Sequence, residues 1–160
     1  MQNTKIFKKG FGIIEIVIAT TIISIAFLIM MSTASMSLKF SEKSVVRLKA
    51  DFLLEEGVEA VKIIRDNDWT TNIASLSVGT DYFLEFNGAI WVVSVNNILI
   101  EGVFERKFTI DDVYRDANDD ISSSGILDSN TKKITVYVSW SEDGSTVTRS
   151  ISFYILNIFN

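Results

Sequence analysis

The chain has 160 residues, with 20 acidic and 15 basic side chains, a net charge of −5, and no Cys, His or Pro. The absence of Cys excludes disulfides and thiol nucleophiles, and the absence of His removes the usual general base and the commonest metal ligand. Most triad-based and zinc-based enzymes are therefore excluded. We expect a protein that is not an enzyme, with no catalytic residue and no cofactor. The acidic balance also argues against direct binding of nucleic acid.

A basic segment precedes the most apolar part of the chain. Residues 1–10 carry three lysines and no acid, and the 21 residues 11–31 contain one ionisable group, Glu15. A helix of that length extends roughly 32 Å, which matches the hydrocarbon core of a bilayer, so we predict a transmembrane helix. The lysines before it favour a cytoplasmic amino end. Three hydroxyl side chains within it can bond back to the helix backbone: Thr20, Thr21 and Ser24.

Three ways of processing this segment stay open. Cleavage after Ala34 would make it a secretory signal, but the apolar run exceeds the roughly 7–15 residues of such signals and has an acid near its start. Cleavage at Gly10 would leave the apolar helix on the mature protein. The third alternative is an uncleaved anchor.

Glu15 is the residue that separates these alternatives. A carboxylate in hydrocarbon costs about 2.5–3.5 kcal/mol on insertion scales. It either reaches the lipid headgroups and has no further role, or it meets a cation inside a protein assembly. Cleavage after Gly10 would create such a cation, namely the new α-amino group of Phe11.

Residues 8–15 read KKGFGIIE and lead directly into the apolar run. This pattern resembles the class III signal of type IV pilins and pseudopilins, and the resemblance covers roughly residues 5–35. It implies that a prepilin peptidase cuts between Gly10 and Phe11, that the new amino terminus of Phe11 is N-methylated, and that Glu15 is the assembly glutamate.

Two features depart from the family pattern. Many pilins carry Pro where this chain has Ser32, so a melting of the helix within a filament is not carried over. Many pilins also have a disulfide near the carboxyl end, which this chain cannot form. Its head must therefore be held together by packing alone.

The helix is expected to continue beyond the membrane as an amphipathic stalk. We predict one helix over residues 11–66, of which 11–31 is transmembrane. Gly57 interrupts the apolar pattern and indicates either a close approach of a sheet or a slight bend. The acidic residues Glu55, Glu56 and Glu59 are expected on a solvated face. Apolar residues recur at helical spacing: Val46, Ala50, Leu53, Leu54, Val58, Val61 and Ile64.

After residue 70 the apolar period changes to two, which is typical of strands. The dipeptide Asn87-Gly88 is a hairpin signal, and Asp143-Gly144 marks a second turn. We predict an antiparallel sheet of four to five strands, the fifth being 98–100, in a β-sheet head over residues 67–160. One face of the sheet should cover the helix, giving an α+β fold that looks like the head of minor pilins. The three tryptophans are expected in the core or at its rim: Trp69, Trp91 and Trp140.

Residues 111–130 form the most polar part of the head and are predicted to be a loop. Asp116, Asn118 and Asp120 imitate the first three ligands of an EF-hand, but the positions that need Gly and a bidentate Glu carry Ile and Leu. Two interpretations stay open. One is an ordinary turn whose side chains bond their own backbone. The other is a loose Ca²⁺ site that also uses Asp128.

The resemblance implies a minor type IV pilin, which would sit in the cytoplasmic membrane and then join an extracellular helical filament for adhesion, motility or DNA uptake. Its expected partners are identical or related pilin subunits, the prepilin peptidase and methyltransferase, and the pilus assembly machinery. A pseudopilin of a type II secretion system is the alternative within the family. A single-span anchored binding module that does not polymerise is the alternative outside it.

Overall fold

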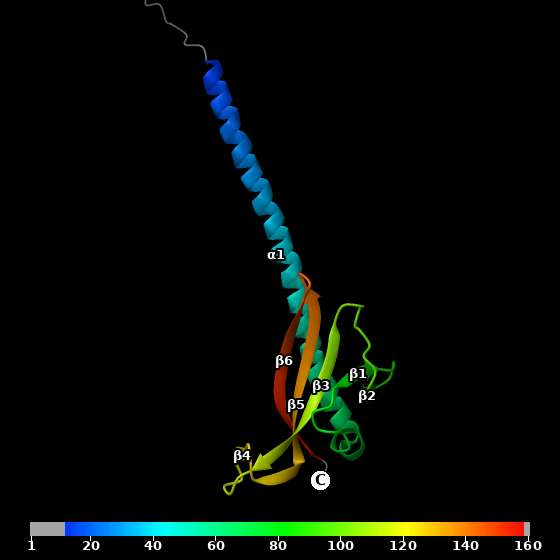
Figure 1. Cartoon of the computed structure of the whole chain (residues 1–160). Helices are drawn as coiled ribbons and strands as arrows, with labels where there is room; N and C mark the ends of the chain where they lie inside the picture. The colour runs from blue at the N-terminus through cyan, green and yellow to red at the C-terminus, as the bar shows by residue number, and fades with distance from the viewer. Residues whose placement is uncertain (1–11, 159–160) are drawn as a thin grey trace, which may run out of the picture. The chain divides into compact units, whose positions relative to one another are not determined.

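A computed structural model describes residues 12–158 (Figure 1). Over this range the secondary structure comprises the α-helix α1 (Ile13–Asn67), the short π-helix η1 (Thr70–Ala74) and six strands. The strands are β1 (Tyr82–Phe86), β2 (Trp91–Ser94), β3 (Glu105–Arg115), β4 (Ile121–Ser122), β5 (Ile126–Glu142) and β6 (Ser145–Leu156). The chain divides between Ser44 and Val45 into two units, the helix segment (residues 13–44) and the globular unit (residues 45–158).

The helix segment has no buried residue, and only Lys43 within residues 13–44 is even half-buried. Its hydroxyl groups bond back to the helix as predicted. Thr21 donates to the carbonyl of Val17 at 2.7 Å, and Ser24 donates to the carbonyl of Thr20 at 2.8 Å. Because the hydroxyls find acceptors in their own helix, they fit within an apolar stretch.

All pairs of neighbouring strands in the globular unit are antiparallel. The order across the sheet is β2-β1-β3-β5-β6, and β4 pairs with β3 outside this path. β1 and β2 form the hairpin that was predicted around Asn87-Gly88. Asp143 and Gly144 both have positive φ values, 53° and 79°, as a two-residue turn between twisted strands requires. The predicted α+β fold class is confirmed.

The part of α1 in the globular unit packs on one face of this sheet. Ala60, Val61 and Ile64 of the helix are buried in one cluster with Phe108 of β3 and Val136 of β5. A second cluster joins residues of α1 and β5 with the residue just before β3: Ala50, Phe104, Val138 and Trp140. The predicted apolar stripe is therefore the face that forms the core. Each Val, Ile or Phe side chain of this core contributes roughly 1.5–3 kcal/mol when fully buried.

Gly57 lies where α1 approaches the sheet closely. A Cβ atom at this position would lie 2.9 Å from Cγ1 of Val136 and 3.2 Å from Cδ of Arg106. The first of the two explanations for this glycine is therefore correct. The sheet lies so near the helix axis that a methyl group would collide with it.

Two predictions about the sheet were wrong. Residues 98–100 do not form a strand, because Ile100 makes only an isolated bridge to Phe104. Residues 111–130 are not one loop, since β3 extends to Arg115, β4 lies within the range, and β5 begins at Ile126. The sheet consequently has six strands rather than four to five. Backbone pairing tolerates polar side chains wherever these face solvent, so a polar stretch can continue a strand.

Glu56 is exposed, as predicted for the solvated face, and its Oε2 also accepts a hydrogen bond from Nη1 of Arg106 on β3 at 2.5 Å. Arg106 is only 5% exposed, and its guanidinium carbon lies 4.9 Å from the centre of the Trp91 ring. The pair joins the helix to the sheet, and the ring adds a cation–π contact.

Candidate assembly site and the acidic loop

Glu15 lies in the first turn of α1, where it has a local role. Its Oε2 accepts a hydrogen bond from the backbone N–H of Gly12 at 3.0 Å. The carbonyl of Gly12 in turn accepts the N–H of Glu15 at 3.0 Å and that of Ile16 at 3.3 Å. Gly12 is thus the N-cap, and Glu15 reaches back to it as the third residue of a capping box does. A carboxylate at this end of a helix also interacts favourably with the helix dipole.

Sequence analysis missed this capping role, although an acid three residues after the N-cap residue is the usual signal for it. Between residues 12 and 38, Glu15 is the one ionisable side chain. Its helix neighbours Ile14 and Ile16 are exposed. The carboxylate therefore lies on the surface of an apolar helix, where a second molecule can approach it.

Gly10 and Phe11 lie outside the described residues, as does the whole of the basic segment 1–10. The cleavage site, the N-methylation of Phe11 and the pairing of its amine with Glu15 therefore stay predictions. Among the described residues, α1 is the one helix with a stretch long and apolar enough to span a membrane, and none of that stretch is buried. Such a stretch is typical of a membrane anchor or a signal segment.

A second apolar face of α1 was not recognised from the sequence. Val45, Leu48 and Phe52 lie in the globular unit and are 62%, 56% and 62% exposed. Their three- and four-residue spacing places them on one side of the helix. We call these three residues the outer stripe. Exposed apolar patches of this kind mark interaction surfaces. The sequence signal for the outer stripe is the repeat of large apolar residues between the predicted core positions.

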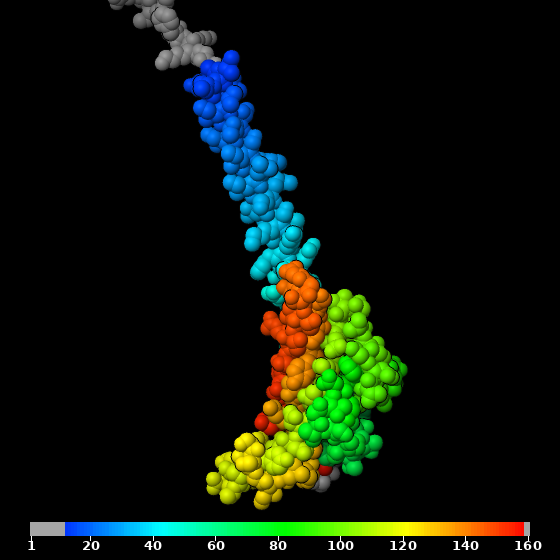
Figure 2. Space-filling view, viewed as in Figure 1, coloured from blue at the N-terminus to red at the C-terminus, as the bar shows by residue number. Residues whose placement is uncertain are grey.

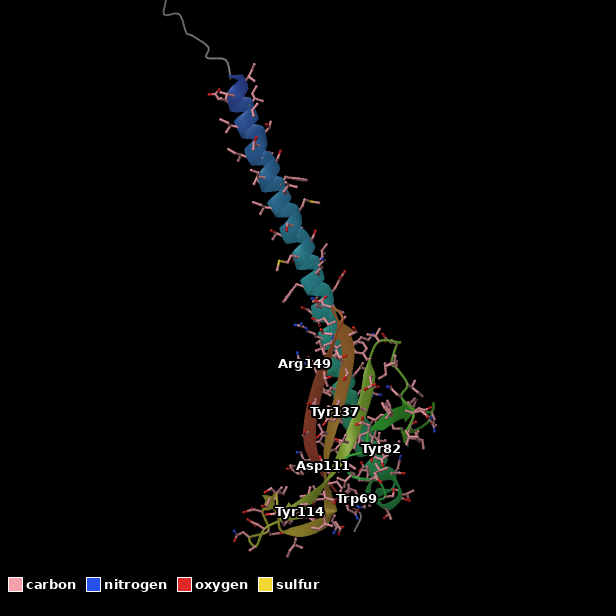
Figure 3. All side chains as sticks on the ribbon, viewed as in Figure 1. Trp69, Tyr82, Asp111, Tyr114, Tyr137 and Arg149 are labelled. Carbon is pink, nitrogen blue, oxygen red and sulfur yellow. The ribbon has the colours of Figure 1, made fainter. Side chains whose placement is uncertain are left out.

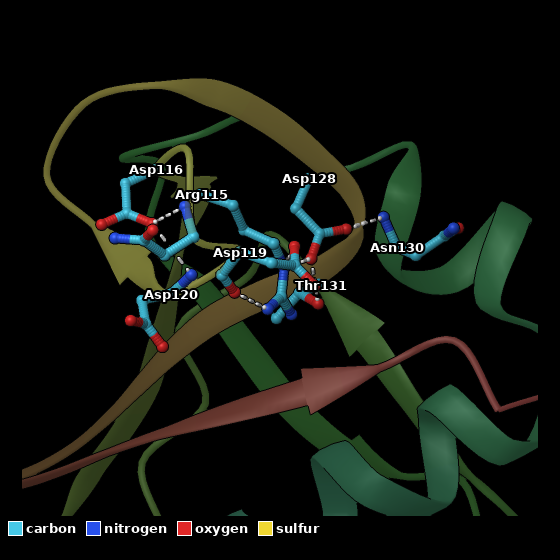
Figure 4. Close-up of polar contacts among 8 residues, drawn as sticks. Arg115, Asp116, Asp119, Asp120, Asp128, Asn130 and Thr131 are labelled. Carbon is cyan, nitrogen blue, oxygen red and sulfur yellow. Dashed lines mark hydrogen bonds and ion pairs between the residues drawn. The ribbon is translucent and has the colours of Figure 1, made fainter.

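The loop candidates for Ca²⁺ form a self-contained turn (Figure 4). Oδ1 of Asp116 accepts the backbone N–H of Asn118 at 2.8 Å and that of Asp120 at 3.1 Å. The backbone of Asp116 also donates to the carbonyl of Asp120 at 3.0 Å. These are the bonds that the turn interpretation predicts. Within residues 12–158, no three acidic side chains converge as a metal site would require.

Asp128, the fourth Ca²⁺ candidate, is engaged by its neighbours. Its Oδ2 accepts hydrogen bonds from Nε of Arg115 at 2.7 Å and from the hydroxyl of Thr131 at 2.7 Å. The bond from Arg115 is the main reason that the pKa of Asp128 is lowered, and the bond from Thr131 adds to it. The segment from β3 through β4 to the start of β5 projects from one end of the sheet, yellow in Figure 2. Arg115 and Asp128 tie its two sides together.

Gly125 allows this projection to close. A Cβ atom there would lie 2.1 Å from the carbonyl oxygen of Arg115, and its φ of 144° is unfavourable for other residues. The acidic loop is thus a hairpin extension held by an Asx-type turn, the ion pairs of Arg115 with Asp119 and Asp128, and one glycine.

No family model, curated protein or solved structure matches the chain. The family resemblance therefore depends on the residues around Glu15 and on the fold. The fold is pilin-like: an amino-terminal apolar helix continues into an amphipathic half, and that half packs on an antiparallel sheet.

Proposed function

We propose that the chain is a type IV pilin-like structural subunit, a minor pilin, that is cleaved after Gly10 and incorporated into an extracellular helical filament. The observation that carries this proposal is the exposed apolar surface of α1 beyond the membrane-spanning stretch. Large apolar side chains stay exposed as far as Phe52: Met36, Leu38, Phe40, Val45, Leu48 and Phe52.

Length decides what can cover that surface. Phe52 follows Met31 by 21 residues, and 21 residues of helix extend about 32 Å, which equals the thickness of a second hydrocarbon core. A bilayer that covers residues 11–31 therefore cannot also cover Phe52 at the far end of the exposed surface. A single-span anchor that acts alone would leave the outer stripe in water, whereas neighbouring helices in a filament would cover it.

Glu15 supplies the register of assembly in this proposal. Cleavage after Gly10 frees the α-amino group of Phe11, and Glu15 of one subunit pairs with that amine on a neighbour. Methylation leaves the amine charged. A buried charge with a matched partner is far less unfavourable than an isolated one, so subunits are held best where the pair closes.

The first experiment replaces Glu15 with Leu or Gln. We expect both variants to be cleaved at Gly10 and to remain in the membrane, but to enter sheared filaments at least tenfold less than the wild-type chain. Gln retains a hydrogen-bonding side chain, so it separates the loss of charge from the loss of the helix cap. Wild-type incorporation of both variants would exclude the register mechanism.

The second experiment tests the outer stripe with the double variant Leu48→Glu/Phe52→Glu. Its matched control is Ile126→Glu, which places a carboxylate at an exposed apolar residue of the same unit but away from α1. We expect the double variant to fold and to be processed normally, yet to be absent from filaments, while the control is incorporated. Normal incorporation of the double variant would favour the anchored module that does not polymerise.

Processing is tested separately by intact mass and amino-terminal sequencing of the membrane-extracted protein. We expect the mature chain to begin at methylated Phe11, and Gly10→Ala to accumulate as the full-length precursor. A chain that still begins at Met1, or one that begins after Ala34, would exclude the pilin proposal. Those results would favour an uncleaved anchor or a secreted protein, respectively.

A further inference from the structure

The sheet face that points away from α1 is polar and regular. Because side chains alternate along a strand, the neighbours of the buried residues in β3 and β5 lie on this outer face. The register of β3, β5 and β6 aligns them in rows across three strands. Two successive rows are Thr109, Thr135, Ser152 and then Lys107, Tyr137, Ser150.

The row at the end nearest β4 differs in chemistry. Asp111 of β3 lies opposite Lys133 of β5, which in turn lies opposite Tyr154 of β6. Together with Tyr114 and Ser122 they line a hollow of about 430 Å³. Figure 3 labels Asp111 and Tyr114 where β3 leads toward β4. This volume falls in the range of about 300–1,000 Å³ that is usual for small-molecule sites.

Side chains in the hollow have unused hydrogen-bonding capacity. Elsewhere on the outer face the hydroxyls of Thr135 and Ser152 bond to each other at 2.9 Å. The side chains of Asp111, Lys133 and Tyr154 make no hydrogen bond or ion pair with any residue in the range 12–158. Asp111 and Lys133 are cross-strand neighbours of opposite charge, yet they do not form an ion pair with each other.

We propose that this hollow binds a neutral oligosaccharide. One hexose ring stacks its C–H face on Tyr154, which is 45% exposed. Asp111 accepts hydrogen bonds from the sugar hydroxyls, and Lys133 donates to their oxygens. Sugar hydroxyl groups both donate and accept hydrogen bonds, so one sugar can bind Asp111 and Lys133 at the same time. The carbon-bound hydrogens of its ring can pack on the aromatic face of Tyr154.

Other ligand classes fit the same residues less well. Asp111 repels a phosphate or sulfate. A divalent cation requires several free carboxylates, but Asp112, the other acid of the hollow, is paired with Lys132 at 2.5 Å. An extended peptide binds by adding a strand to an exposed sheet edge, whereas this hollow lies across the face of three paired strands.

The test uses the detergent-solubilised full-length chain on an array of neutral, sialylated and sulfated oligosaccharides. The neutral oligosaccharide with the strongest signal is then titrated in solution. We expect Tyr154→Ala and Asp111→Ala each to weaken that binding at least tenfold. Ser150→Ala is the matched control, because Ser150 lies on the same strand and face but outside the hollow, and it should bind like the wild-type chain.

Three results would overturn the proposal: no neutral oligosaccharide binds, the two variants bind as the control does, or binding is confined to sulfated and sialylated glycans and is lost in Lys133→Ala. The last result would indicate simple ionic attraction. The hollow lies wholly within the globular unit, so this test is independent of polymerisation. Its failure is therefore distinguishable from a failure of the filament proposal.

Discussion

The two parts of α1 are equally recognisable as helix but differ in what covers them. Ile22 in the helix segment is 62% exposed, whereas Ile64 in the globular unit is 1% exposed. Both are isoleucines with the same tendency to leave water. The globular unit supplies the cover for Ile64 from β1, β3 and β5, and within residues 13–44 nothing comparable is present.

This difference separates folding from assembly. Apolar residues of the globular unit contribute to the stability of the isolated chain, because their burial is complete within it. Apolar residues of the helix segment gain nothing until lipid or another subunit covers them. The outer stripe combines the two situations, since it lies on a folded helix but remains exposed.

The largest effect is expected from a matched pair of substitutions, Ile64→Ala and Ile22→Ala. Loss of the buried side chain should lower the free energy of unfolding by about 2–5 kcal/mol, because a cavity remains. The exposed site should change it by less than about 0.5 kcal/mol. Denaturant unfolding in detergent, followed by tryptophan fluorescence, measures both values. Equal destabilisation by the two variants would show that the helix segment is part of the folding unit.

The second effect concerns the pair that joins α1 to the sheet. Glu56→Ala removes the partner of a nearly buried guanidinium and should destabilise the globular unit by about 1–3 kcal/mol. Arg106→Met removes the charge itself and should destabilise less, because Met fills much of the same space. The two unfolding midpoints provide the comparison. If Arg106→Met were the more harmful change, the stack on Trp91 would outweigh the ion pair.

The third effect is a steric one at Gly57. Alanine normally favours a helix by about 1 kcal/mol over glycine, yet here the added methyl would lie 2.9 Å from Val136. Overpacking of this kind costs about 1–3 kcal/mol, so Gly57→Ala should destabilise slightly. The double variant Gly57→Ala/Val136→Ala relieves the collision and should recover part of the helix preference. Two strictly additive single effects would contradict this account.

Periodicity predicted the elements that depend on local pattern. The helix ends at Asn67, one residue beyond the predicted end, and the predicted turn at Asn87-Gly88 joins β1 and β2 as a hairpin. The core stripe of α1 was also predicted correctly. Apolar residues at a fixed spacing carry the information for the stripe, and the Asn-Gly dipeptide carries it for the hairpin. Both signals are local, so distant parts of the chain do not alter them.

Features that depend on distant pairing were not predictable in this way. Glu56 and Arg106 are 50 residues apart, and nothing in either local pattern connects them. β4 and the start of β5 contain only short apolar stretches set among Asp, Asn, Ser and Gly residues, so they resemble a loop until the turn at Asp116 brings the backbones of β3 and β4 together. The cap formed by Glu15 depends on a hydrogen bond to Gly12 within the same turn, which neither of the two roles expected for this carboxylate included. The hollow near Tyr154 requires three strands in register.

The smallest effect is expected at Asp128, and it concerns the stability of the globular unit alone. Arg115 and Thr131 hold the pKa of Asp128 below its ordinary value of 3.8. Because the folded form binds its proton less readily, this carboxylate stabilises the fold above about pH 4. That contribution is lost as the pH falls through the lowered value. Between pH 5 and pH 2, the wild-type chain should therefore lose more stability than Asp128→Asn.

Asp120→Asn is the control for that measurement, because the side chain of Asp120 accepts no hydrogen bond from Arg115. We expect its acid unfolding to follow the wild-type curve. At each pH both variants should associate with membranes as the wild-type chain does, since residues 120 and 128 lie outside the apolar stretch of α1. A common acid midpoint for Asp128→Asn and the wild type would show that Arg115 orders the hairpin extension without stabilising the globular unit.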